Sequence, residues 1–195
     1  MKTSSHSNLI VRAVSLTLLF GALPTLAYAH PGHADGLAQG LAHPFSGLDH
    51  LCAMLAVGLW AAQLGGRAAW LVPLSFVAVM ALGGLLGAAA IALPFVETGI
   101  LLSLLALGLL VAAAVRLPLA LSAGVVGVFA LFHGYAHGAE MSPGASAFAY
   151  ALGFMMASAF LHLSGFTFGM AIRARLLRFA GAAVAMTGGW LWFAA

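Results

Sequence analysis

The chain has 195 residues, of which 64% are hydrophobic and only 6% are charged, and its mean hydropathy is +1.11. Soluble domains carry about 25% charged residues, so the composition argues against a soluble protein and predicts an integral protein of the lipid bilayer. The net charge of +3 comes from seven basic residues spread along the chain, which leaves no basic face for nucleic acid. The single cysteine, Cys52, excludes a disulfide framework and a thiolate zinc site.

The first 29 residues have the pattern of a cleavable secretory signal peptide. A basic start precedes an apolar stretch at 13–23, and Ala27-Tyr28-Ala29 supplies the small residues of a cleavage site. An uncleaved first transmembrane helix is the alternative, but the apolar stretch is about half as long as the roughly 20 residues that a span needs. We therefore expect a signal peptide at 1–29 and a mature chain that begins at His30.

The rest of the chain divides into a short N-terminal segment and one transmembrane domain. Residues 30–40 form a short segment whose first part is polar and turn-rich, as in a mobile terminus, whereas residues 41–195 are mostly apolar. Apolar runs of about 20 residues, separated by glycine, proline or charge, predict membrane-spanning helices. The six predicted spans are 41–63, 69–92, 96–115, 118–139, 145–171 and 177–194. The predicted fold class is an all-α, six-helix membrane bundle.

The arginines between the predicted spans indicate the orientation of the bundle. They follow the first, third and fifth spans, so all of them fall on one side of the membrane: Arg67, Arg116, Arg173, Arg175 and Arg178. Loops rich in lysine and arginine stay in the cytoplasm. Both ends of the mature protein are therefore predicted outside, an N-out/C-out arrangement that agrees with an exported N-terminus.

The first span carries ionisable groups where hydrocarbon is expected. These are His43, Asp49 and His50, and Met54 follows one turn later. An aspartate at the centre of a membrane helix costs about 2.5–3.5 kcal/mol, so Asp49 must face a polar partner or a ligand. Because a residue before proline is biased away from helix, we expect His43 to cap the helix above Pro44.

A second polar group lies on the fourth span. His133 and His137 are four residues apart and Glu140 is seven residues from His133, so at 3.6 residues per turn the three share one helix face. The first and fourth spans should run antiparallel, which brings Glu140 to the same outer surface as His43. His137 then lies between Glu140 and His133 in depth.

Helical rise predicts that these groups form two levels. His43 should pair with Glu140 near the outer surface, and Asp49 and His50 should meet His133 about 10 Å deeper. Seven residues of continuous helix are too long for one ion to touch both His43 and His50. We therefore expect two successive half-sites.

Imidazole and carboxylate together suit divalent ions such as nickel, cobalt and zinc. We interpret the two groups as a metal site, with hydrogen-bonded helix packing as the alternative. His162, roughly 25 Å from the outer end of the fifth span, predicts a third and inner level, and Met54 is a further candidate on the pathway. His30 and His33, with the free α-amine, are candidates for capturing metal outside.

With these residues identified, the mature chain resembles the HupE/UreJ family of hydrogenase and urease accessory proteins. Three motifs carry the resemblance: His43-Pro44 with Gly47, Asp49-His50 and Met54; Phe132–Glu140, read as Phe-His-Gly-x-Ala-His-Gly-x-Glu; and Leu161-His162 with Gly165. The resemblance implies a six-helix permease with a cleaved signal peptide that imports nickel, or in some members cobalt, across the bacterial inner membrane. It also implies a set of metal-handling positions: His43, Asp49, His50, His133, His137 and Glu140.

We therefore expect a permease without a prosthetic group, not an enzyme. The ion would leave its water at His43 and Glu140, be held by the inner histidines with Asp49, and leave past His162, with a cytoplasmic metallochaperone as a candidate acceptor. The rival is a membrane-embedded zinc hydrolase with Asp49 or Glu140 as base and Ser46 nearby. Its familiar His-Glu-x-x-His pattern is not met, because Gly134 stands where the base would be. A bis-histidine haem protein is a third interpretation.

Overall fold

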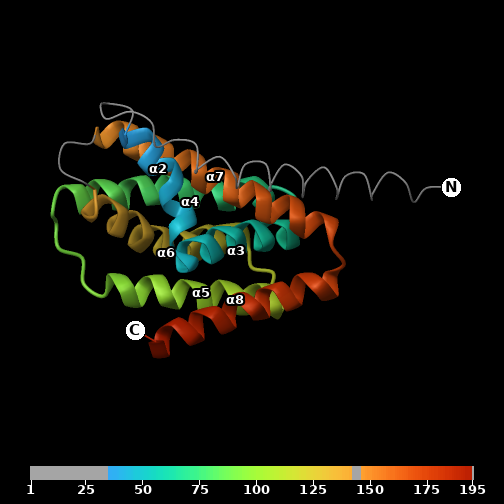
Figure 1. Ribbon diagram of the computed structural model, residues 1–195. Helices are drawn as coiled ribbons and strands as arrows, with labels where there is room; N and C mark the ends of the chain where they lie inside the picture. Colours follow the sequence, from blue (N-terminus) through green and yellow to red (C-terminus); the bar gives the residue numbers. More distant parts are fainter. Residues whose placement is uncertain (1–34, 142–145, 195) are drawn as a thin grey trace.

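The computed structural model describes residues 35–141 and 146–194, and in this part of the chain every regular element is an α-helix (Figure 1). The helices are α2 (Asp35–Ser46), α3 (Leu48–Leu64), α4 (Ala68–Ala88), α5 (Val96–Ala112), α6 (Leu119–Ala139), α7 (Ala147–Ala171) and α8 (Ala174–Ala194). Each apolar run forms a helix because its backbone groups, once in lipid, must be hydrogen-bonded within the segment. The predicted all-α class is confirmed. The predicted signal peptide lies outside the described residues.

The first predicted span, 41–63, is wrong as a single continuous helix. The chain bends by 83° between α2 and α3. Gly47 is extended at the bend, with φ −102° and ψ 125°, and Ser46 Oγ donates to the carbonyl of His43 at 2.7 Å. Because α2 starts at Asp35, residues 35–40 are helical. His43 is therefore inside α2 rather than a cap, and Pro44 lies within the same helix, where it has no backbone N–H to donate.

The helix lengths indicate a multi-pass membrane protein. In the described part of the chain, α4, α6, α7 and α8 are each long and apolar enough to cross a bilayer, and the bent pair α2–α3 meets the same criterion when taken together. α5 is apolar but has only 17 residues, which is at the short limit for a span. The count of six spans and the N-out/C-out topology stay predictions.

The helices pack through glycine contacts. α4 packs on α6, α5 on α8, and both α2 and α3 on α7, while α3 also contacts α4, α5 and α8; Figure 1 shows α5 and α8 side by side along one edge. A Cβ atom at any of several glycines would overlap the backbone of the facing helix: Gly83, Gly87, Gly134 and Gly138 between α4 and α6, and Gly58 and Gly165 between α3 and α7. Small residues let helices approach closely in a membrane, where no hydrophobic effect drives them together.

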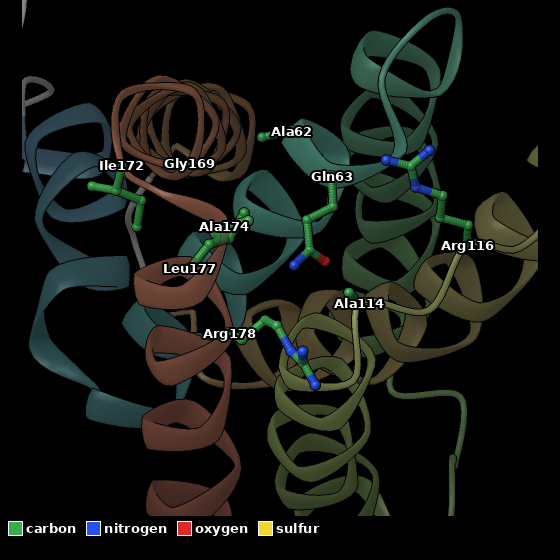
Figure 2. Close-up of a pocket in the computed structure, with 9 residues that line it drawn as sticks. All are labelled: Ala62, Gln63, Ala114, Arg116, Gly169, Ile172, Ala174, Leu177 and Arg178. Carbon is green, nitrogen blue, oxygen red and sulfur yellow. The ribbon is translucent and has the colours of Figure 1, made fainter.

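The arginine-bearing turns gather at one end of the bundle. Gln63 from the end of α3, Arg116 after α5, Ile172 after α7 and Arg178 near the start of α8 line one pocket of about 240 Å³ (Figure 2). Arg178 Nε donates to the carbonyl of Ala112 at 2.7 Å, tying α8 to α5 there. Arg116 and Arg178 thus lie at the same end of the bundle, as predicted, and the cytoplasmic location of the arginines stays a prediction.

Candidate metal site

The bend at Gly47 brings the polar residues of α2 and α3 together. A Cβ atom at Gly47 would lie 2.5 Å from Asp49 Oδ1 and 3.3 Å from His50 Nδ1, and the first of these distances is shorter than real Cβ contacts allow. Only glycine therefore lets the carboxylate fold back beside the bend. The motif was expected to be one helical stretch, but it bends between two helices, with His43 on α2 and His50 on α3.

His43 meets the end of α6, as predicted. His43 Nε2 lies 3.3 Å from Glu140 Oε2, and both side chains are partly exposed. The ring of His43 also packs edge-on against that of His137, with centroids 4.5 Å apart. Potential ligand atoms of His43, His137 and Glu140 all lie within 4.8 Å of one another, a spacing that one metal ion could bridge.

His50 is oriented by its neighbour Asp49. Asp49 Oδ1 lies 2.9 Å from His50 Nδ1 and also accepts the His50 backbone N–H at 2.8 Å. A carboxylate only accepts hydrogen bonds, so in the neutral ring Nδ1 carries the hydrogen and Nε2 keeps the lone pair. Nε2 is buried and has no hydrogen-bond partner in the described part of the chain. Carboxylate-oriented histidines of this kind are typical metal ligands.

The predicted pairings, His43 with Glu140 and His50 with His133, are found, with His137 between them as expected, but the two levels are joined and not separate. The ring of His137 touches not only His43 but also His50, at a centroid distance of 4.3 Å, and His50 in turn lies 4.7 Å from His133. The four rings form one continuous row, which we call the histidine chain: His43, His137, His50 and His133. The physical reason is the 83° bend, which shortens the separation that a continuous helix would have imposed.

His133 is held by a serine that no sequence motif revealed. Ser103 Oγ on α5 donates to the carbonyl of Ile100 at 2.6 Å and lies 2.9 Å from His133 Nε2. Because the single hydroxyl hydrogen goes to the carbonyl, Ser103 accepts from Nε2–H, and the lone pair of His133 is on Nδ1. That atom is buried without a partner among residues 35–141 and 146–194. Ser103 could have been suspected as a lone hydroxyl in an otherwise apolar stretch of helix.

His137 is the least satisfied member of the histidine chain. Both of its ring nitrogens are buried, and neither has a hydrogen-bond partner in the described segments. Its ring packs on Phe154 of α7, at a centroid distance of 3.9 Å, and Phe154 stacks in turn with Tyr150. An unpaired buried polar atom costs about 1–3 kcal/mol. This cost is understandable if the nitrogens bind a ligand.

The remaining predicted residues lie elsewhere. His162 is buried on α7, and its Nδ1 donates to the carbonyl of Met54 at 2.9 Å. Met54 is fully buried in the core, and Cys52 is a half-buried free thiol. His30 and His33 lie outside the described residues. The described site is thus built from α2, α3, α5, α6 and α7, with α4 contributing Phe76 against His133.

The donor set is four imidazoles with two carboxylates, and no thiolate belongs to it. Imidazole nitrogen and carboxylate oxygen suit borderline divalent ions of the first transition row. A comparison with protein families matches residues 17–191 to the model described as HupE / UreJ protein. The chain belongs to the HupE/UreJ family.

A curated relative supports this assignment over most of both chains. The chain is 51% identical to Protein HupE of Rhizobium leguminosarum bv. viciae over 181 residues, which cover 90% of this chain and 94% of that protein. No solved structure was found to match the chain. The resemblance predicted from the three motifs is therefore confirmed at the level of the HupE/UreJ family.

Proposed function

We propose that this HupE/UreJ protein imports Ni²⁺, or the related ion Co²⁺, across the bacterial inner membrane to supply the maturation of metalloenzymes. The observation that carries the proposal is the histidine chain, in which histidine rings from α3 and α6 lie against one another. Buried ring nitrogens in this row have no hydrogen-bond partners in the described segments. Ionisable groups inside a membrane protein are costly and mark ion pathways.

The two ends of the histidine chain suit different steps. At the outer end, His43 and Glu140 are partly exposed, so they can take an ion that still holds water. Further in, His50 and His133 are buried, and their hydrogens are bonded to Asp49 and Ser103, so each presents a lone pair. The ion would exchange its water for imidazole nitrogen as it passes along the row.

No group of four ligands closes around one point in this arrangement of the described residues. Adjacent rings are 4.3–4.7 Å apart between centroids, so an ion would be shared by successive pairs of histidines. Incomplete sites in series let an ion bind and leave, whereas one closed site would trap it. The outer group of His43, His137 and Glu140 does offer three ligand atoms within 4.8 Å of one another, the number that a resident catalytic zinc uses. The row of rings continues inward from this group to His133, and this continuation favours a permease over the rival zinc hydrolase.

The membrane location and partners follow from the same proposal. The arginine-rich end of the bundle would face the cytoplasm by the positive-inside rule, which puts His43 and Glu140 on the periplasmic side with the mature N-terminus. A cytoplasmic metallochaperone would then receive the ion at the arginine-rich end. Capture by His30 and His33 before entry belongs to the same scheme.

The proposal is tested by nickel accumulation in cells that express the protein. His50→Ala and His133→Ala should reduce accumulation to the level of cells without the protein, at unchanged protein level in the membrane. Ser122→Ala is the matched control, because Ser122 is also fully buried but bonds the carbonyl of Leu117. Normal accumulation in both histidine variants would refute the pathway.

A further inference from the structure

Two unpaired polar atoms lie on α7 outside the histidine chain. Ser158 Oγ is fully buried, and His162 Nε2 belongs to a residue that is 2% exposed. Neither atom has a hydrogen-bond partner in residues 35–141 or 146–194. The two residues are four apart on one helix, so their side chains are neighbours on the same face. Two such buried groups on one helix face need an explanation, and a shared ligand would supply one.

The same face of α7 leads to the histidine chain. Tyr150 and Phe154 precede Ser158 and His162 at four-residue intervals, and Phe154 packs on the ring of His137. A rise of 1.5 Å per residue puts Ser158 about 6 Å and His162 about 12 Å further along the axis than Phe154. Ser158 therefore lies at a depth between His137 and His162.

His162 presents its lone pair in a defined direction. Its Nδ1 lies 2.9 Å from the carbonyl oxygen of Met54, and a carbonyl only accepts, so Nδ1 carries the hydrogen and Nε2 has the lone pair. A backbone carbonyl behind a histidine is a common way to orient a metal ligand. The unpaired Nε2 is thus prepared to bind a cation.

An aromatic ring packs against both His162 and His133, the inner end of the histidine chain. Phe76 on α4 is fully buried, and its ring centroid lies 5.9 Å from that of His133 and 5.1 Å from that of His162. An apolar side chain between two polar groups interrupts an ion path in the way that hydrophobic constrictions close channels. We therefore treat His133 and His162 as separate positions on the path.

We propose that Ser158 Oγ and His162 Nε2 form a second, inner binding position for the transported divalent cation, reached from the histidine chain past the ring of Phe76. The inference rests on the proposed function and adds a residue, Ser158, that belongs to none of the sequence motifs. One imidazole and one neutral hydroxyl make a weaker site than the histidine chain, with water completing the coordination. A weaker inner position favours onward movement of the ion.

The test is a calorimetric titration of the purified full-length protein with Co²⁺. The wild type should bind in two events of different affinity. Ser158→Ala should weaken the lower-affinity event about tenfold and His162→Gln should remove it, while both leave the tighter event unchanged. Ser122→Ala, the matched buried serine, should alter neither. A lower-affinity event that is unchanged in both variants, or a wild type with only the tighter event, would overturn the inner position.

Two further measurements distinguish metal binding at Ser158 from a purely structural role of this serine. Because the hydroxyl of Ser158 has no partner in the described structure, Ser158→Ala should unfold at or above the wild-type temperature; a clear loss of thermal stability would contradict the proposed role. His43→Ala should weaken only the tighter event. Complete absence of Co²⁺ binding by the wild type would count against the proposed transport itself, whereas loss of only the second event would count against the inner position alone.

Discussion

Removal of the Ser103 hydroxyl tests how the structure prepares His133 for metal. Ser103 accepts from His133 Nε2–H at 2.9 Å, which leaves the lone pair on Nδ1. In Ser103→Ala the Nε2–H is left buried without an acceptor, and the ring can exchange to the tautomer that carries its hydrogen on Nδ1. Losing a partner that orients a metal ligand costs about 10–100-fold in affinity, which corresponds to about 1.4–2.7 kcal/mol.

The assay for this prediction is Co²⁺ titration of purified Ser103→Ala beside Ser122→Ala. Both changes remove a fully buried hydroxyl that bonds a backbone carbonyl, so their direct effects on folding should be similar. Only Ser103→Ala should weaken binding of the more tightly bound Co²⁺ ion. If the two variants bind Co²⁺ as tightly as the wild type, the assignment of Nδ1 as the ligand atom of His133 is refuted.

Three further changes follow from the same geometry. Gly47→Ala places a methyl group against the Asp49 carboxylate and should weaken Co²⁺ binding at least tenfold in titrations, as expected when the orientation of a ligand is disturbed. Unchanged affinity would mean that the bend at Gly47 does not position the site. Asp49→Asn keeps the size of the side chain but removes its charge, and should weaken the same binding by about 10–100-fold; equal affinity would exclude a role for the carboxylate. Gly134→Ala should lower the thermal unfolding temperature because its methyl group meets the backbone of Met80, whereas Gly124→Ala, with open space around it, should not. Equal unfolding temperatures of the two variants would contradict the close packing of α4 on α6.

Most helices of the fold could be predicted from the sequence because an apolar run in lipid has few alternatives to a helix. The predicted run 118–139 and the helix Leu119–Ala139 differ by one residue at one end. The bend at Gly47 could not be predicted in this way, since glycine is tolerated in membrane helices and hydropathy continues across it. The backbone conformation of Gly47 depends on the tertiary packing of α2 on α7. The sequence pattern carries no information about this packing.

The candidate site was predictable in its residues but not in its shape. His133 and His137 share a face because they are four residues apart on one helix. The assumption of antiparallel packing also correctly predicted the pairing of His43 with Glu140. His137 was expected between the two levels, but its ring contacts with both His43 and His50 depend on the bend and were not predicted. Ser103 was also missed, because its hydrogen bond joins residues 30 positions apart on different helices. The only local signal is a lone hydroxyl in an apolar stretch.

The most direct test of metal transport along the histidine chain is uptake of radioactive Ni²⁺ into proteoliposomes that contain the purified protein. We expect time-dependent uptake by the wild type and by Ser122→Ala, and only the background of empty liposomes for the double variant His50→Ala/His133→Ala. Uptake by the double variant at the wild-type rate would contradict passage of the ion along the histidine chain.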